Sequence, residues 1–194
     1  MINFKTLYAI RHSQTHEDRG NICSGWTEAT PIESDIDKVH DIIINFVSNK
    51  QIGLIICSEQ SRTIKTAQSI QTKLGISKLT IDSCFNDLDF GYFSGKSPGL
   101  IKKIQPEIYD DRGFFKYYMP LKDGESLANL ETRVRKGLKR LSTLCYSKDI
   151  LLITHGSVIV MLHKILFNQD YYNFFPTVDI EARKYKIFEF QTSK

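Results

Sequence analysis

Short apolar runs alternate with segments of helical periodicity along this chain, and this alternation restricts the folds that it can adopt. Four runs have the length and composition of buried strands, at residues 7–10, 54–57, 79–82 and 149–154. Strands that alternate with helices across short links form mainly parallel sheets covered by helices on both faces. We therefore expect an α/β fold, with a mainly parallel central sheet between two helical layers in a three-layer α/β/α sandwich.

Helical patterns fill most of the intervals between these runs. We expect a helix over 34–49 with Ser34 as its N-cap, a helix capped by Ser58 and closed by Gly75, and a helix over 157–167. The tail, residues 178–190, looks extended, and a turn near Arg183 would let it add edge strands. A further long helix is indicated by apolar positions that step by three or four, at Leu127, Leu130, Val134, Leu138 and Leu141.

Composition indicates one domain and a small charged ligand. The chain has 194 residues, 41% of them hydrophobic, which is enough for one substantial core, so we expect a single domain over 1–194. The formal charge is only +4, and 26 basic residues are spread among 22 acidic ones, so no nucleic-acid footprint is indicated. A phosphorylated small molecule suits this balance.

Cysteine spacing and hydropathy favour a reducing, aqueous compartment. No run approaches the roughly 18 apolar residues of a membrane span, and the first residues have no long apolar segment. We expect a soluble, cytoplasmic protein that binds no membrane. The cysteines are too scattered for a zinc or dithiol site and are interpreted as reduced, mostly buried thiols: Cys23, Cys57, Cys84 and Cys145.

Two of the strand-like runs end on a histidine. Residues 7–10 lead directly into Arg11 and His12, and the run at 149–154 leads into His155 and Gly156. The carboxyl ends of parallel strands meet in one crevice, so both histidines can face one ligand. Arg62, one turn into the helix after Ser58, would add a guanidinium beside a helix N-terminus, which favours an anion. Taken singly, each of these residues is more often structural.

Several short motifs occur together and in order. They lie at 11–15, 57–62, 90–95, 124–126 and 154–156. In this order and spacing the chain resembles the histidine phosphatase superfamily, in the branch that contains the cofactor-dependent phosphoglycerate mutases and their phosphatase relatives. The segment 24–26 is similar to the serine-glycine-tryptophan of the mutases' substrate loop. The resemblance implies a phosphoglycerate mutase-like fold with a variable lid insertion, here about 96–123.

The resemblance implies a role for each site residue. His12 would be the nucleophile that becomes phosphohistidine, while Arg11, Arg62 and His155 would bind the phosphoryl group. Asp87 would protonate the leaving oxygen and later take a proton from water. No metal or cofactor is implied, because guanidinium and imidazole groups supply the positive charge. The substrate side would be lined by Gln14, Thr15, Asp18, Ser24, Gly25 and Gly156.

The chain departs from the family pattern at three positions. Ser13 replaces the usual glycine, Asp87 replaces a glutamate one methylene longer, and Asp18 replaces an asparagine. The shorter acid matters most, because catalytic geometry is sensitive at about the ångström level. Asp89 and Glu125 are fallback acids.

The lid insertion bears on the choice between hydrolysis and phosphoryl relay. It lacks the paired arginines with which the mutases grip a carboxylate, and Phe90 stands where their acid loop has a tyrosine. Both features favour hydrolysis. The basic run of the long helix lies off its apolar stripe and is interpreted as a solvated face: Arg133, Arg135, Lys136, Lys139 and Arg140. The lid residues could stack on a leaving group or pack into the core: Tyr109, Arg112, Phe114, Phe115, Lys116, Tyr117 and Tyr118.

Three functional hypotheses follow. The leading one is a phosphatase that hydrolyses a small phosphomonoester through phosphohistidine. The second is a cofactor-dependent phosphoglycerate mutase, favoured by the motif at 24–26. The third is a non-catalytic binder of phosphorylated ligands, favoured by Ser13 and Asp87. The sequence leaves open the substrate and whether the chain forms a homodimer.

Overall fold

The computed structural model describes residues 5–143 and 148–191, in which five strands form one sheet. The strand order is β3-β2-β4-β1-β5, and the first four strands are parallel while β5 pairs antiparallel with β1 at the edge. The predicted mainly parallel sheet is confirmed. The strands are β1 (Leu7–Arg11), β2 (Ile52–Cys57), β3 (Leu79–Ile81), β4 (Asp149–Thr154) and β5 (Phe188–Phe190).

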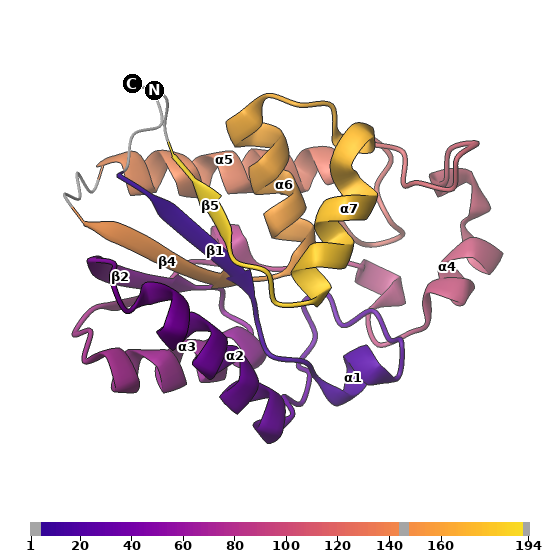
Figure 1. Cartoon of the computed structure of the whole chain (residues 1–194). Helices are drawn as coiled ribbons and strands as arrows, with labels where there is room; N and C mark the ends of the chain where they lie inside the picture. Colours follow the sequence, from indigo (N-terminus) through magenta and orange to yellow (C-terminus); the bar gives the residue numbers. More distant parts are fainter. Residues whose placement is uncertain (1–4, 144–147, 192–194) are drawn as a thin grey trace.

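Helices cover both faces of the sheet (Figure 1). On one face lie α2 (Glu33–Val47) and α3 (Ser61–Leu74), and on the other lie α5 (Leu127–Thr143), α6 (Gly156–Phe167) and α7 (Tyr171–Arg183). Successive strand residues point to opposite faces, so in β1 Tyr8 and Ile10 pack with α2 and α3 while Leu7 and Ala9 join the larger core beneath α5, α6 and α7. The α/β/α sandwich is confirmed.

Short elements gather beyond the carboxyl ends of the parallel strands (Figure 1). The loop after β1 contains α1 (His16–Arg19), and the lid insertion contains α4 (Pro98–Ile104) and the 3₁₀ turn η3 (Pro106–Ile108). Two further 3₁₀ turns, η1 (Ser83–Phe85) and η2 (Gly91–Phe93), flank the segment that carries Asp87. Gly91 has φ +50°, and a Cβ there would lie 2.3 Å from the Asp123 carbonyl carbon, so the close crossing of these loops requires glycine.

Several predicted boundaries need correction. The N-cap of α2 is Ile32 rather than Ser34, and α3 begins after Gln60, so Ser58 does not cap it. Gly75 ends α3 as predicted, with φ +63°. The tail prediction is confirmed only in part: residues up to Arg183 form α7 rather than a strand, whereas 188–190 form the predicted edge strand β5.

The helical signal of α7 starts before the segment that looked extended. Tyr171, Phe174, Val178 and Ala182 are buried and recur at intervals of three and four. Pro176 lies inside the helix and conceals this pattern, because proline removes one backbone donor and usually marks a helix boundary.

The cysteines that the structure describes are free thiols. Cys23, Cys57 and Cys84 are free, and burial raises the pKa of Cys23 to about 11 and that of Cys57 to about 12. Cys145 lies outside the described residues.

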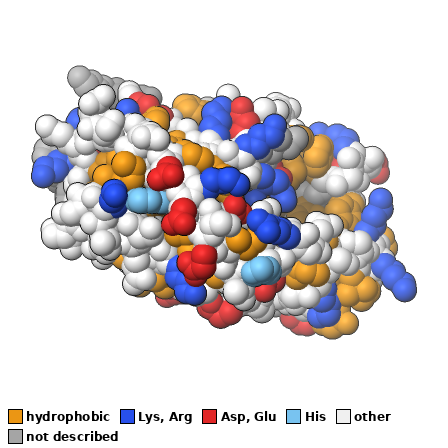
Figure 2. Space-filling view, turned by 60° about the horizontal axis from the view of Figure 1, so that its bottom comes forward, with side chains coloured by type: hydrophobic (Ala, Val, Ile, Leu, Met, Phe, Trp, Pro, Cys, Tyr) orange, Lys and Arg blue, Asp and Glu red, His pale blue; other side chains and the backbone are white. Residues whose placement is uncertain are grey.

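Within 5–143 and 148–191, none of the helices combines the length and apolar character needed to cross a bilayer. Figure 2 shows basic and acidic side chains intermingled on one face, with hydrophobic surface between them.

Candidate active site

Strand register brings the two predicted histidines together. Arg11, the last residue of β1, pairs with Thr154, the last residue of β4, and the His12 amide donates to the Thr154 carbonyl at 2.9 Å. His12 and His155, the next residue in each strand, therefore lie side by side, with 5.1 Å between their ring centroids. Their exposed fractions are 2% and 1%.

His12 is held as a neutral imidazole. Its Nδ1 lies 2.6 Å from the Ser13 carbonyl oxygen, which can only accept, so Nδ1 carries the proton. Nε2 then bears the lone pair and accepts from Arg62 Nε at 3.3 Å. Burial, followed by the charges of Arg62 and Arg11, holds the pKa of His12 well below its usual 6.5. The ring is thus uncharged at neutral pH, with a free electron pair on Nε2.

Arg62 connects the histidine to two loops. It lies in the first turn of α3 and is 1% exposed. Its Nη2 donates to the Gly25 carbonyl at 2.7 Å and to Asp87 Oδ2 at 3.2 Å, and its Nη1 donates to the Thr27 carbonyl at 3.2 Å. One guanidinium therefore contacts His12, the predicted acid Asp87 and the loop that contains Gly25.

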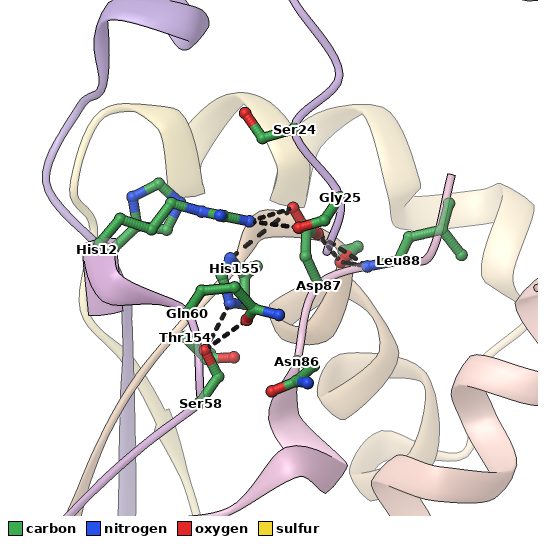
Figure 3. Close-up of polar contacts among 12 residues, drawn as sticks. His12, Ser24, Gly25, Ser58, Gln60, Asn86, Asp87, Leu88, Thr154 and His155 are labelled. Atoms are coloured by element: carbon green, nitrogen blue, oxygen red, sulfur yellow. Dashed lines mark hydrogen bonds and ion pairs between the residues drawn. The ribbon is translucent and has the colours of Figure 1, made fainter. Parts of the chain in front are cut away.

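Asp87 points into the same space from the opposite loop (Figure 3). Its Oδ1 accepts from the Ser157 hydroxyl at 2.6 Å and from the Leu88 amide at 2.9 Å. Its Oδ2 meets Arg62 and lies 3.7 Å from His155 Nδ1. The carboxylate is thus oriented from one side, which leaves Oδ2 directed at the site.

One ring nitrogen of His155 is hydrogen-bonded, and the other has no hydrogen-bond partner among the described residues. Its Nε2 lies 2.8 Å from Ser58 Oγ, and Ser58 donates its own proton to Gln60 Oε1 at 2.7 Å, so Nε2–H donates to Ser58. Its Nδ1 is buried and has no hydrogen-bond partner among the described residues. Burial, and then the charge of Arg62, lower the pKa of His155 well below 6.5. A ligand that donates a hydrogen bond to Nδ1 would satisfy this atom.

Arg11 and Asp18 form a fixed pair at the mouth of the site. Arg11 Nη2 lies 2.5 Å from Asp18 Oδ1, and Asp18 also closes a capping box with Thr15 at the start of α1. Although burial opposes it, the Arg11 charge and the contacts of Thr15 lower the pKa of Asp18. The aspartate therefore stays ionised, which offsets part of the Arg11 charge.

Ser13 does not enter the space beside His12. Its hydroxyl lies 3.2 Å from Thr66 Oγ1, and its amide donates to the same oxygen at 3.2 Å. The side chain is fully buried against α3. The departure from glycine at this position is thus absorbed by packing.

A cavity of about 250 Å³ opens over these groups. It is lined by most of the predicted site residues, namely Arg11, His12, Asp18, Ser24, Arg62, Asp87 and Gly156. The others lie near it: Gln14 lines an adjoining hollow of about 80 Å³, Thr15 caps α1, and Gly25 offers its carbonyl to Arg62. His155, also a predicted site residue, is not among the lining residues of the described chain, and its Nε2 bonds Ser58.

The fallback acids have other partners. Glu125 forms an ion pair with Arg133 at 2.5 Å and accepts from the Asp89 amide at 2.9 Å. Asp89 accepts from the Gly91 amide at 2.9 Å. Neither is among the lining residues of the described chain, whereas Asp87 is. The same part of the chain contains no group of three or more His, Cys, Asp or Glu side chains placed to hold a metal ion.

The sequence did not predict that Arg133 holds the loop that carries Asp87. It was expected on a solvated face, yet its side chain is 16% exposed and donates to the carbonyls of Asn86 and Asp87, each at 2.6 Å. Trp26 Nε1 donates to the same Asp87 carbonyl at 2.7 Å. These contacts fix the backbone that presents the acid. The only sequence signal was its place near the edge of the apolar stripe, eight residues after Glu125.

Comparisons with known proteins agree with the geometry. The family model described as Histidine phosphatase superfamily (branch 1) matches residues 7–194. A relative from Hydrogenobacter thermophilus named "Putative phosphoserine phosphatase 2" is 25% identical over 159 residues, 80% of this chain and 75% of the relative. Phosphoglycerate mutase-like protein 4 of Arabidopsis thaliana is 22% identical over 164 residues, 84% and 71% of the two chains. The solved structure of Bacillus stearothermophilus YhfR shares the fold, with TM-score 0.76, 19% identity and coverage of 87% and 82%.

We expect Arg133→Ala to lower the free energy of unfolding by about 3 kcal/mol, because it removes the cation paired with Glu125 and one donor to each of the carbonyls of Cys84, Asn86 and Asp87. Urea unfolding monitored by circular dichroism measures this. Arg135→Ala is the matched control, since Arg135 is half exposed and pairs with Glu131 on its own helix, and it should cost about 0.5 kcal/mol. Equal losses in the two variants would contradict the role given to Arg133.

The buried histidines predict a specific pH dependence of stability. The pKa of His155 is lowered in the folded chain, so below about pH 6.5 the unfolded chain binds a proton that the folded chain does not. The free energy of unfolding therefore decreases as pH falls from about 6.5 to 5, by up to about 1.4 kcal/mol per pH unit for this residue. In urea titrations, His155→Gln should flatten this slope, whereas exposed His16→Gln should leave it as in the wild type. An unchanged slope in His155→Gln would refute the assignment.

Proposed function

Because the chain belongs to the histidine phosphatase superfamily, branch 1, we propose that it is a phosphatase that hydrolyses a small phosphomonoester through a phosphohistidine intermediate on His12. The observation that carries this proposal is the position of Arg62, which touches both His12 Nε2 and Asp87 Oδ2 beside one cavity. A phosphoryl group bound to Arg62 would lie between a nucleophile and an acid.

Phosphoryl binding uses groups that are already oriented. Arg11 and Arg62 offer charged donors, and both line the cavity. His155 Nδ1, which has no hydrogen-bond partner among the described residues, offers a buried acceptor to a protonated oxygen of the phosphoryl group. The N-terminus of α6, at Gly156 and Ser157, faces the same cavity and adds a favourable dipole for an anion. The two guanidinium groups and the helix dipole also match the negative charge that develops in transfer.

In the first step, His12 Nε2 attacks phosphorus and the bond between phosphorus and the ester oxygen breaks. The Nδ1 contact to the Ser13 carbonyl stabilises the positive charge that the ring acquires. Asp87 gives its proton to the departing oxygen. The arriving phosphoryl group competes with Asp87 for Arg62. Asp87 therefore loses its ion pair with Arg62 at the step in which its carboxyl group has to be protonated.

In the second step, water attacks phosphorus and passes a proton to Asp87. The nitrogen–phosphorus bond breaks, inorganic phosphate leaves, and the lone pair returns to His12 Nε2. Ser157 and the Leu88 amide hold Asp87 Oδ1 through both steps, so Oδ2 is the oxygen that carries the proton. Asp87 ends the cycle protonated, ready for the next substrate.

A phosphoglycerate mutase is the second candidate, favoured by the relative named mutase-like and by the motif at 24–26. Here Trp26 is 48% exposed and bonds the Asp87 carbonyl, so the motif also has a structural role. An assay of phosphoglycerate interconversion with bisphosphoglycerate as primer separates the two candidates, because a phosphatase releases inorganic phosphate instead.

We expect the purified protein to release phosphate from a panel of phosphomonoesters in the presence of EDTA, because arginines supply the positive charge. His12→Ala should lower kcat at least about 1,000-fold. Acid quench after mixing with ³²P-labelled substrate should trap labelled protein in the wild type and not in His12→Ala. His16→Ala, an exposed ring in the next helix, is the control and should keep both signals. Phosphate binding without turnover or labelling would instead favour the non-catalytic binder.

Asp87→Asn should slow hydrolysis in a way that depends on the leaving group. An alkyl ester needs a proton on its departing oxygen, whereas p-nitrophenolate leaves without one. We expect kcat to fall about 100-fold or more for an alkyl phosphate and clearly less for p-nitrophenyl phosphate. Steady-state kinetics on both esters measures this. Equal losses on the two esters would mean that Asp87 is not the proton donor.

A further inference from the structure

The cavity has two chemically different ends. The charged groups described above occupy the end beside His12, and the remaining walls are mainly apolar. These walls come from segments far apart in the sequence: the loop after α1, the loop of Asp87, the lid with its helix α4, the start of α5, and helix α7. Their main contributors are Leu88, Phe90, Ile101, Phe115, Leu127 and Phe175.

The aromatic walls are held in place before any ligand arrives. Phe115 packs on Tyr109, with 5.1 Å between ring centroids, and Phe175 stacks on Tyr171 at 5.1 Å. The Tyr172 hydroxyl donates to the Phe115 carbonyl at 3.1 Å, which ties the lid to α7. Phe115 and Phe175 are only partly buried, so each presents apolar surface that a ligand can cover.

The outer end offers poor contacts to an anion. Of the lining residues in the described chain, three are basic: Arg11, Arg62 and Arg183. Arg11 and Arg62 belong to the phosphoryl end, and Arg183 is paired with Asp179 at 2.9 Å. Asp179 also lies over Gly156, where an added Cβ would be 3.1 Å from its Oδ1. A carboxylate on the leaving group would therefore meet an aspartate and would have to break an ion pair.

Because the cavity has a charged end beside His12 and an apolar outer end, we infer that the substrates are phosphomonoesters whose leaving alcohol is uncharged and apolar, about the size of one aromatic ring. The inference rests on the proposed function. Burial of one ring against these walls should favour such a substrate over a small polar ester by about 30-fold in kcat/KM. The volume of about 250 Å³, below the usual range of sites for drug-sized ligands, sets the upper size.

Steady-state kinetics on the wild type tests the substrate class. Benzyl phosphate, glycerol 3-phosphate, phosphoserine and phosphocholine all release alkyl alcohols, so differences in kcat/KM report mainly on the pocket. We expect benzyl phosphate to exceed the other three by about 30-fold. A higher value for phosphoserine would point to recognition by Asp179 and Arg183, and a higher value for phosphocholine to recognition of a cation; either result would overturn the inference while leaving hydrolysis intact.

Variants locate the effect in the named walls. Phe115→Ala and Phe175→Ala should each lower kcat/KM for benzyl phosphate about 10-fold, mainly through KM, and should change the value for glycerol 3-phosphate less than about 2-fold. Tyr118→Ala is the matched control, because this lid ring is 83% exposed and does not line the cavity. Equal losses for both substrates would contradict the role of the apolar walls.

Binding to the unaltered protein separates failure of this inference from failure of the proposed function. Benzylphosphonate and 2-carboxyethylphosphonate carry a bond to phosphorus that hydrolysis does not break, and calorimetry measures both. We expect benzylphosphonate to bind at least about 10-fold more tightly, with a negative heat-capacity change from apolar burial. The same preference without turnover of any ester would refute the phosphatase and leave the ligand class intact. Tighter binding of the carboxylate would overturn the ligand class.

Discussion

The buried guanidinium of Arg62 is the interaction on which the site depends. A charge with 1% exposure costs several kcal/mol unless its donors are satisfied, and its partners here come from three separate segments. They are His12 Nε2, the carbonyls of Gly25 and Thr27, and Asp87 Oδ2. The need to satisfy one cation thus draws the loop after α1 and the loop of Asp87 onto the end of the sheet, where strand register has already placed two histidines.

Much of this arrangement could be predicted from local sequence, because it follows from strand ends. His12, Ser58 and His155 each come directly after a parallel strand, and β2, β4 and β1 are neighbours in the sheet. A buried strand is recognisable from its own apolar residues, so its last position is recognisable as well. Arg62 follows from the same logic, since the first turn of a helix after such a strand faces the same edge.

The parts that sequence reasoning missed depend on contacts between distant segments. Arg133 is one of several basic residues on α5, and only the position of the loop carbonyls of Asn86 and Asp87 distinguishes it from Arg135. The sequence shows that Ser13 replaces the usual glycine, but it does not show where the side chain points. That depends on Thr66, whose hydroxyl is the partner of Ser13 in the fold. The ordered motifs identify which residues belong to the site, whereas packing decides which of them face the ligand.

The position of α7 after His12 and Asp87 in the chain has a consequence for protein synthesis. His12 and Asp87 have both been translated by residue 87, whereas Tyr171, Tyr172 and Phe175, which line the cavity or secure the lid, are translated only after residue 170. A nascent or truncated chain that stops before residue 171 also lacks the β5 edge of the sheet. The α7 wall of the cavity is therefore added only after His12, Arg62 and Asp87, which form its charged end, have been made.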